Sequence, residues 1–480
     1  MKLSSSLRVV TATSLNIALY AVTGGRYLLL EGRVRGGIFR NWLQEYRYLP
    51  RSVARPTTEA ELVHLVRSAR HLRVFGSGHS FNDGVVSEEV LVSLDDFSGL
   101  VARHPEKGQI TVRAGTRIRD VVELLAAEGL AFEGLPSHDA QSIGGILSTD
   151  VHGTGRSWGF VSDSVVALTL VDGTGAVHRC GPTDELFRAA VGGVGAVGII
   201  TEVTVQGVPR FNVEQRTQLK DVAHVRAQLD QLLADHDHLS LYLYPFSDTC
   251  QVNTWDRTAR PQSRCGDVRE FLAISADAWL AATLGNLLAY GRLLPLSPLF
   301  SRLGSRLRRG TRLVLDSPRA FNRSIYHLHQ ELEFTVAFED TWDVCDRFLR
   351  LYEELYPSGL PYTLIEVRFT PEGHDRTLLG AGRDRRSTWV DLISNDSDGY
   401  ELYYAAAVRL LRELGARPHL GKYCDGVTAE LLERAHGDSY RRFLDLVAEH
   451  DPDATLGNAF TRPLFGARSV AADPADAGTF

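Results

Sequence analysis

Residues 193–198 spell Gly-Val-Gly-Ala-Val-Gly, a literal match to the GxGxxG fingerprint of dinucleotide-binding folds. That fingerprint requires a strand before the glycines and a helix after them, because the pyrophosphate lies against the N-terminus of the helix. Here a helix-like run, 182–193, comes first and a β-branched run, 197–208, follows. The sequence therefore argues against a Rossmann fold, although the glycines still allow the backbone to approach a ligand closely.

Short helices and strands mix between residues 50 and 208, which is typical of an α+β domain. Thr58 and Glu61 form a capping box at the start of one helix, and Arg73–Phe75 is predicted to be a short buried strand. We expect Thr116 to cap a second helix and Gly129 to end it in the left-handed conformation. The other predicted elements are strands at 89–94, 109–115 and 197–208, helices at 116–129 and 182–193, and a hairpin over 164–180 with Asp172-Gly173 at its turn.

Composition limits the class of protein. A chain of 480 residues is too long for one ordinary core, so we expect two domains. Its net charge of −7 argues against a nucleic-acid partner, because phosphate binding needs a basic surface. Five cysteines are dispersed without a CxxC pair, which indicates reduced thiols in a cytoplasm and neither a disulfide framework nor a metal site.

Two apolar stretches leave the relation to membranes open. Residues 8–30 have an apolar centre that polar side chains interrupt, so a leading helix, a membrane anchor and an export signal all remain alternatives. Residues 278–313 are apolar first and basic last. They fit either a buried helix pair with a solvated end or a surface that rests on a membrane.

Two stretches combine glycine with small polar residues. Residues 74–84, VFGSGHSFNDG, pass from a predicted strand into a Gly-Ser-Gly turn and place His79 on its edge. Residues 137–159, SHDAQSIGGILSTDVHGTGRSWG, hold many hydroxyls and little bulk. Free backbone N–H groups in such stretches suit a flat anionic ligand whose pyrophosphate lies against the main chain.

These two stretches and the glycines that precede 199–209, in this order, resemble the FAD-binding domain of the vanillyl-alcohol oxidase superfamily. In the second half, IEVRFTP (365–371), ARPHLGKY (416–423) and DPDATLGNAF (451–460) resemble its aldonolactone and alditol oxidase branch. The resemblance covers roughly residues 40–465. It implies a two-domain α+β fold that binds FAD, with a substrate domain built on an antiparallel sheet flanked by helices.

We expect four segments on this basis. They are a leading helix or weak anchor at 1–39, the FAD-binding domain at 40–208, the substrate domain at 209–424, and a C-terminal segment at 425–480 that returns to the FAD domain. The cofactor-binding positions that the resemblance implies are Gly76, Ser77, Gly78, His79, Ser80, Ser142, Gly144, Gly145, Ser148, His152, Gly198 and Ile200.

The resemblance also implies a role for His79. In this family the histidine of the GxGHS motif is bonded covalently to the 8α-methyl group of the flavin, and His79 occupies that position. An imidazole nitrogen is a good nucleophile near neutral pH, and a glycine turn brings it to the ring edge without steric conflict. We therefore expect FAD to be covalently attached through His79.

Oxidation of an alcohol carbon needs a hydride acceptor, a base for the hydroxyl proton, and positive charge near the reduced flavin. Glu366 and Arg368 lie at i and i+2 of a predicted strand, so both point to one face. Lys422 matches the family's lysine near the flavin, and His419 lies three residues before it. Glu366, His419 and Lys422 all remain candidates for the base.

The predicted activity is FAD-dependent oxidation of a CH–OH group in an alcohol, polyol or lactone, with O2 or another electron acceptor. Two departures from the family pattern bear on the substrate. Leu420 stands where tryptophan is usual, and Asp150-Val151 stands where small residues are common. Loss of the tryptophan leaves room for a larger molecule, so a tailoring oxidase of a bulkier metabolite is the alternative.

Overall fold

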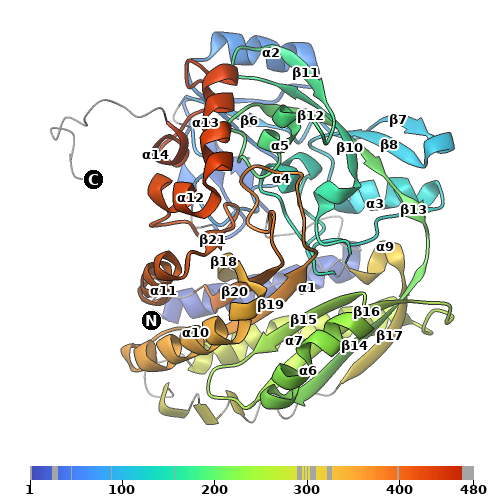
Figure 1. Ribbon diagram of the computed structural model, residues 1–480, viewed down its shortest axis with the longest axis vertical. Helices are drawn as coiled ribbons and strands as arrows, with labels where there is room; N and C mark the ends of the chain where they lie inside the picture. The colour runs from blue at the N-terminus through green and yellow to red at the C-terminus, as the bar shows by residue number, and fades with distance from the viewer. Residues whose placement is uncertain are drawn as a thin grey trace.

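The computed structural model describes residues 3–23, 31–44, 46–87, 89–155, 157–288, 294–296, 298–299, 301–302, 310–321, 327–396 and 399–466. Mixed helices and mainly antiparallel sheets form an upper and a lower part in the view of Figure 1. This architecture confirms the two-domain α+β fold class that the sequence predicts. The N-terminal elements are α1 (Leu3–Thr23), β1 (Arg33–Arg35), β2 (Ile38–Arg40) and β3 (Arg47–Tyr48).

The upper part contains a parallel three-stranded sheet, in the order β4-β6-β5, and an antiparallel five-stranded sheet, in the order β11-β10-β12-β8-β7. Helix α5 precedes the glycines at 193–198 and strand β12 follows them, so the element order confirms the argument against a Rossmann fold. The elements are β4 (Ser52–Ala54), α2 (Glu59–Ser68), β5 (Leu72–Phe75), β6 (Val90–Ser93), β7 (Leu100–His104), η1 (Pro105–Lys107), β8 (Gln109–Arg113), α3 (Ile118–Ala127), β9 (Leu130–Ala131), α4 (Ile143–Ser148), η2 (Val161–Ser164), β10 (Val165–Val171), β11 (Val177–Cys180), α5 (Glu185–Ala190), β12 (Ile199–Gln206) and β13 (Val208–Pro209).

The local signals in this part are confirmed with two exceptions. The capping box of Thr58 and Glu61 is only half formed, because the Glu61 carboxylate accepts a hydrogen bond from the Thr57 N–H and not from that of Thr58. The Thr58 hydroxyl caps α2 by accepting a hydrogen bond from the Glu61 N–H, and Gly129 follows α3 with φ of 72°. Thr116 does not cap α3, because that helix begins one residue later than predicted. Arg117 is its N-cap residue, and the Thr116 hydroxyl instead donates to the Arg113 carbonyl at 2.6 Å.

The lower part is built on an eight-stranded sheet in the order β17-β14-β16-β15-β19-β20-β18-β21. Helices α6, α10 and α11 cover one face of this sheet (Figure 1). The elements are β14 (Asn212–Asp221), α6 (Val222–Asp235), β15 (His238–Leu243), β16 (Thr249–Thr258), α7 (Gly266–Leu288), η3 (Leu294–Leu296), β17 (Thr311–Asp316), α9 (Ser317–Ala320), β18 (His329–Ala337), η4 (Phe338–Asp340), α10 (Thr341–Leu355), η5 (Tyr356–Ser358), β19 (Thr363–Thr370), β20 (Ser387–Asn395), α11 (Tyr400–Leu414) and β21 (Arg417–Pro418).

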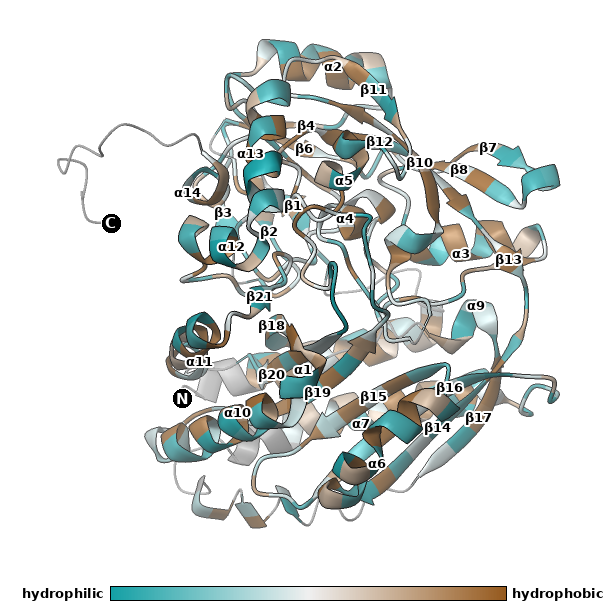
Figure 2. Ribbon diagram, viewed as in Figure 1, coloured by the Kyte–Doolittle hydropathy of each residue, from teal (hydrophilic) through white to brown (hydrophobic). Residues whose placement is uncertain are grey.

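Apolar and polar side chains alternate along the central strands, so this sheet has one apolar and one polar face. The apolar side chains pack against α6, α10 and α11, which show alternating hydrophobic and hydrophilic bands in Figure 2. They include Leu332, Phe334 and Val336 of β18, Ile365, Val367 and Phe369 of β19, and Val390 and Leu392 of β20. The residues between them, among them Glu366 and Arg368, therefore point to the other face, where loop 149–159 of the upper part lies.

The chain returns to the upper part after β21. Helices α12 (Ala429–His436), α13 (Asp438–His450) and α14 (Arg462–Phe465) share a hydrophobic core with the two upper sheets, whereas α11 belongs to the core of the lower sheet. We propose that the domain division follows these two cores, with the segment after residue 424 belonging to the upper domain.

Helix α1 lies against α7 of the lower part. The rings of Tyr20 and Phe271 stack 5.5 Å apart, and Val9 shares a small core with Ala282 and Trp42. An ion pair between Arg8 and Asp396 adds a polar contact. Within the described residues, no helix is both long enough and apolar enough to cross a bilayer.

A buried charged contact joins the two parts. His374, in the loop between β19 and β20, places Nε2 3.2 Å from the Asp150 carboxylate and Nδ1 3.3 Å from Asp163. Burial works to lower the pKa of His374, but Asp150 and Asp163 outweigh it and raise the pKa to about 9. Asp150 has a φ of 50°, which a non-glycine residue adopts only at a cost, so this contact helps to hold a strained turn.

We predict that His374→Gln destabilises the protein in a pH-dependent way. The folded pKa of about 9 lies above the unfolded value of 6.5, so the folded state binds the extra proton. The ionic contribution is therefore full below pH 6.5 and is lost as the pH rises through about 9. Urea unfolding of both proteins should show a difference of roughly 2–3 kcal/mol at pH 6 that shrinks towards pH 9.5. A difference that does not change with pH would contradict this assignment.

Candidate active site

The upper domain contains an elongated cavity between the end of β5, the N-terminus of α4 and residues 194–200. It encloses about 940 Å3 of non-protein space, part of which is open to solvent. Eleven of the twelve predicted cofactor-binding residues line this cavity. They are Gly76, Ser77, Gly78, His79, Ser80, Ser142, Gly144, Gly145, Ser148, Gly198 and Ile200.

The GSGHS turn supplies anion-binding groups to this cavity. In the described part of the chain, the backbone N–H groups of residues 77–80 have no hydrogen-bond partner. Gly78 has a φ of 62°, and such turns point successive N–H groups inward as a nest for phosphate oxygens. A side chain at Gly76 would overlap Ser142, and the Ser77 hydroxyl accepts a hydrogen bond from the Ser142 N–H. These residues fit the pyrophosphate of FAD.

A second cavity lies between the GSGHS turn and the polar face of the lower sheet. Both cavities are lined by His79, Ser80, Gln141 and Thr149, so they meet at the predicted attachment residue. His152, predicted as a cofactor contact, lines the second cavity and not the first. Leu420 lines the first cavity and is buried there, so its replacement of tryptophan does not widen the second cavity, and the structure offers no support for a bulkier substrate.

His79 is buried among other rings. Its Nδ1 lies 3.1 Å from Nε2 of His138, and the indole of Trp42 stacks against it at 5.8 Å. Burial, together with the neighbouring His138, Arg117 and Arg119, holds the pKa of His79 well below its usual value. The imidazole is therefore neutral at pH 7 and keeps a lone pair, as a nucleophile requires.

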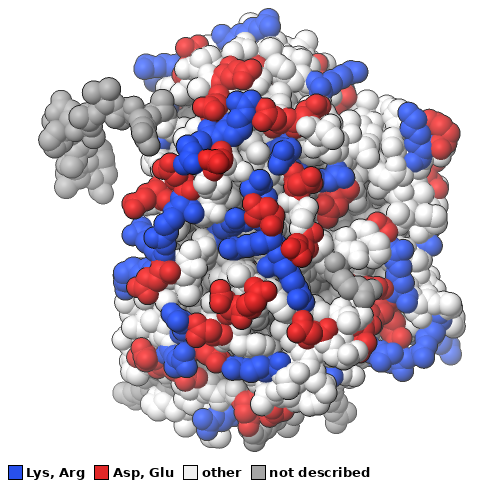
Figure 3. Space-filling model, in the orientation of Figure 1, with Lys and Arg blue, Asp and Glu red and all other residues white. Residues whose placement is uncertain are grey.

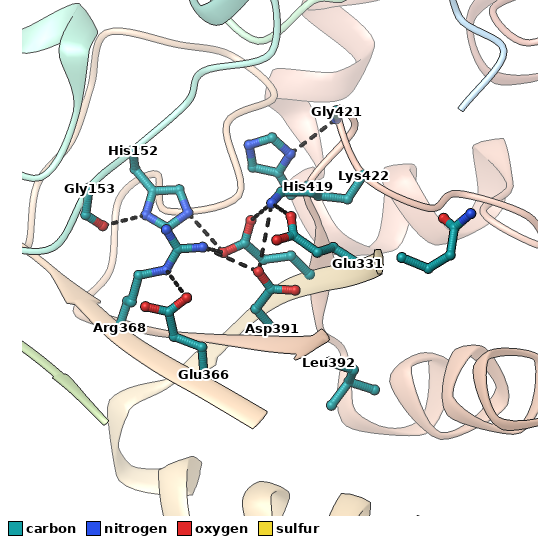
Figure 4. A network of polar contacts seen from close by, with 12 residues as sticks. His152, Gly153, Glu331, Glu366, Arg368, Asp391, Leu392, His419, Gly421 and Lys422 are labelled. Atoms are coloured by element: carbon teal, nitrogen blue, oxygen red, sulfur yellow. Dashed lines mark hydrogen bonds and ion pairs between the residues drawn. The ribbon is translucent and has the colours of Figure 1, made fainter. Parts of the chain in front are cut away.

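The polar face of the sheet carries a row of carboxylates (Figure 4), of which Glu331 and Glu333 line the second cavity. Asp391 on β20 is paired in register with Glu366 on β19 and with Glu333 on β18. Glu331 lies two residues before Glu333 on the same face of β18. Four acidic side chains from three strands thus gather where only one was expected from the sequence.

Two cations are interleaved with these carboxylates (Figure 4). Arg368 pairs with Glu333, lies 3.4 Å from Asp391, and has its Nε 3.9 Å from Glu366. Lys422 pairs with Glu331 and lies 3.6 Å from both Glu333 and Asp391. The structure thus brings together Glu366, Arg368 and Lys422 as predicted. Glu366 does not line the second cavity, however, and contacts Arg368 from the side.

The ionisable groups of this buried network differ in how readily they hold a proton. Burial opposes the charge of Lys422 and Arg368, but the surrounding carboxylates raise the pKa of both above the ordinary range. Arg368 and Lys422 hold the pKa of Glu333 well below its usual value, although burial acts the other way. Burial and Glu331 raise the pKa of Asp391 well above its usual range, so Asp391 is the carboxyl that stays protonated.

These states bear on two of the three base candidates, Lys422 and His419. Lys422 is protonated and has no lone pair to offer. Burial lowers the pKa of His419 to about 4, and its Nδ1 accepts a hydrogen bond from the Gly421 N–H at 3.0 Å. The ring proton therefore sits on Nε2, so His419 donates to the cavity and does not accept from it. Glu333, which lines the second cavity, keeps its Oε2 buried 3.6 Å from Nζ of Lys422, with no hydrogen-bond partner among the described residues.

His152 orients Glu333. Its Nε2 lies 3.1 Å from Glu333 Oε1, its Nδ1 lies 2.8 Å from the Gly153 carbonyl, and its ring stacks 3.6 Å from Trp389. Sequence reasoning missed Glu331, Glu333 and Asp391. The signal was present in HQELEF, where Glu331 and Glu333 alternate with Leu332 and Phe334, as expected of a strand with one polar face.

Comparison with known proteins agrees with this geometry. The sequence matches the FAD binding domain family over residues 50–181 and the D-arabinono-1,4-lactone oxidase family over residues 203–464. The chain belongs to the D-arabinono-1,4-lactone oxidase family. It is an FAD-dependent oxidoreductase of the vanillyl-alcohol oxidase superfamily, as the sequence motifs predicted.

Individual relatives align over nearly their whole length. L-gulono-1,4-lactone dehydrogenase of Mycobacterium tuberculosis is 27% identical over 436 residues, covering 89% of this chain and 99% of that protein. L-gulonolactone oxidase of Bos taurus is 25% identical over 446 residues, covering 90% and 99%. Among solved structures, cholesterol oxidase from Brevibacterium sterolicum superposes with a TM-score of 0.69 at 18% identity, covering 89% of this chain and 96% of that one, which shows a shared fold.

Proposed function

We propose that this chain oxidises a CH–OH carbon of a sugar lactone or related polyol, the substrate class in the names of its relatives. The observation that carries the proposal is the cavity that begins at His79 and ends on the Arg368–Lys422 network. Its closely spaced donors and acceptors suit a molecule with several hydroxyl groups. Bound FAD supplies the ring that accepts a hydride from carbon.

The protein groups then have distinct roles. The carboxylate of Glu333 accepts the hydrogen bond of the reacting hydroxyl, and His419 donates to a neighbouring substrate oxygen. Arg368 and Lys422 supply the positive charge that stabilises the reduced flavin and orients the substrate. Glu366 acts on Arg368, holding its guanidinium in place from the side that faces away from the cavity.

We further propose that FAD is bonded covalently to His79. The neutral imidazole at the junction of the two cavities supports this, because a protonated ring would have no free lone pair. His138 lies within hydrogen-bond distance and provides a neighbouring nitrogen that can exchange a proton with His79.

The covalent bond predicts that acid-precipitated protein stays yellow. A tryptic peptide that spans residues 74–82 should carry the added mass of the flavin. His79→Ala should release its FAD into the supernatant and lose most of its activity, because the flavin is then held by noncovalent contacts alone. A colourless pellet from the unmodified protein, with all of the FAD in solution, would rule the bond out.

The proposed roles predict a graded set of rates. Anaerobic stopped-flow measurements should show that Glu333→Gln and Lys422→Met each slow flavin reduction by roughly 10²-fold or more. Glu366→Gln should cost less, about 10-fold, because Glu366 acts through Arg368. Glu372→Gln changes an exposed carboxylate outside the network and should keep the parent rate. Parent rates in Glu333→Gln and Lys422→Met, with full FAD content, would overturn the assignment.

A separate measurement identifies the electron acceptor that reoxidises the flavin. We propose either O2 or another small acceptor, because relatives are named as both oxidase and dehydrogenase. A panel of aldonolactones and alditols, tested in air and with an artificial acceptor under argon, separates these two activities. Turnover with lactones but none with simple alcohols would narrow the substrate class.

We also propose that α1 and α7 rest on an anionic lipid surface. Nine of the thirteen exposed large apolar side chains among the described residues lie on α1, on α7 or at 294–299. They are Leu7, Leu15, Val22, Val268, Leu272, Trp279, Leu280, Leu296 and Leu299. The sequence between Asp277 and Asp316 contains six arginines and no acidic residue, which complements anionic headgroups. The outer side of α7 is exposed, so of the two alternatives left open for residues 278–313 we favour the surface that rests on a membrane.

This surface predicts that the protein sediments with phosphatidylserine vesicles at low salt and is released as the salt concentration rises. Leu272→Glu with Trp279→Glu should abolish sedimentation, because two charges then enter the apolar face. Leu402→Glu changes an exposed leucine on α11 and serves as the control. Equal sedimentation of all three proteins, or none of the parent at low salt, would contradict the proposal.

A further inference from the structure

Four arginines and a histidine gather away from both cavities. Arg188 comes from α5, Arg383 and Arg385 from the loop before β20, Arg417 from β21, and His436 from the end of α12. None of these five residues lines the first cavity, at the GSGHS turn, or the second cavity, at the polar face of the lower sheet. Lys and Arg side chains also concentrate at mid-height on the face of the molecule drawn in Figure 3, around the level of β21 in Figure 1.

A single carboxylate joins two of these guanidinium groups. Asp384 accepts from Arg383 at 2.6 Å and from Arg417 at 3.0 Å, and its side chain is 45% exposed. Arg417 also donates to the carbonyl of Ala435, next to His436, at 2.9 Å. Arg385 donates to the Thr335 carbonyl at 3.2 Å. Four cationic side chains thus share one direct acidic partner within the described residues.

Five buried nitrogens in this cluster have no hydrogen-bond partner in the described structure. They are Nε of Arg188, Arg383 and Arg385 and both ring nitrogens of His436. His436 is 6% exposed, so water does not reach its ring freely. A folded protein leaves few such groups. The three Nε–H groups and the one N–H of the His436 ring are four donors without an acceptor in one place, which indicates a bound species that accepts hydrogen bonds.

The pKa shifts of the clustered residues indicate that negative charge is lacking around them. Burial and the neighbouring arginines lower the pKa of Arg383, and they lower that of Arg385 to about 10. Burial and three arginines lower the pKa of His436 to about 3. Asp384, Asp375 and Asp340 oppose the shifts of the arginines without cancelling them. Burial is the largest cause of each shift and neighbouring arginines add to it, so the cluster combines burial with positive charge that an anion would neutralise.

We propose that this cluster is a binding site for a phosphate group, either inorganic phosphate or the phosphoryl group of a small metabolite. Guanidinium groups bind phosphate oxygens in pairs with good geometry, and a tetrahedral anion can accept from several directions at once. Burial of Arg417 and His436 limits the ligand to a small anion and excludes a broad protein surface.

The site lies next to the catalytic segment. Arg417 pairs with Thr335 of β18, two residues after Glu333, and His419 follows Arg417 by two positions. A bound phosphate would therefore fasten β21 to α5 and α12 at the base of the segment that carries His419 and Lys422. The proposed anion therefore lies beside the network of Arg368 and Lys422, but it is bound by none of the residues of that network.

The test uses untagged holoenzyme and inorganic phosphate at constant ionic strength. Calorimetric titration should give a saturable isotherm, and the melting temperature should rise along the same curve. Arg383→Gln with Arg385→Gln should weaken binding roughly 10- to 100-fold, the usual effect of losing charge-assisted hydrogen bonds. Arg386→Gln is the matched control, because Arg386 pairs with Asp230 and stacks on Phe338 outside the cluster.

Three further measurements sharpen the result. Sulfate should compete with phosphate and acetate should not, because the site is assigned to a tetrahedral anion. Glucose 6-phosphate tests the second source of the phosphate group. Tighter binding than inorganic phosphate identifies a metabolite site, and weaker binding identifies a site for free phosphate.

A linear, non-saturable rise in melting temperature that the double variant retains is general salt stabilisation, and it overturns the proposal. If the double variant does not fold, absence of a saturable isotherm in the parent protein overturns it equally.

Discussion

Arg368 and Lys422 lie among four carboxylates on one buried face of a sheet, and this arrangement constrains the rest of the molecule. A buried charge is costly unless it is paired and hydrogen-bonded, so none of these groups can be removed alone without leaving another uncompensated. The opposite face of the same strands is apolar and packs against α6, α10 and α11. The helices therefore hold the charged face in one orientation, towards the upper domain.

The upper domain completes the site from the other side. The GSGHS turn brings His79 to the point where the first cavity meets the second, and the segment 149–155 brings His152 onto Glu333. Asp150, next to the residues that line both cavities, is tied to the lower domain by His374. The departure from small residues at this position thus has a structural explanation, since its carboxylate secures the interface between the domains.

Local signals in the sequence predicted much of this arrangement. The order of helix, glycines and strand around 193–198, the glycine turn before His79 and the i, i+2 spacing of Glu366 and Arg368 depend only on neighbouring residues. Glu331, Glu333 and Asp391 were missed because their role arises from pairing between β18, β19 and β20, which local spacing does not reveal. The arginine cluster was missed for the same reason, since its members come from α5, α12, β21 and one loop.

The central claim is that Arg368 and Lys422, the two cations of this network, stabilise the reduced flavin. Its most direct test is the midpoint potential of the bound flavin, measured by equilibrium reductive titration of the parent protein and of Lys422→Met. The account predicts a lower potential in the variant, by roughly 20–40 mV for a loss of about 1–2 kcal/mol in a two-electron couple. Glu372→Gln should leave the potential unchanged. An identical potential in the parent protein and Lys422→Met would contradict the account.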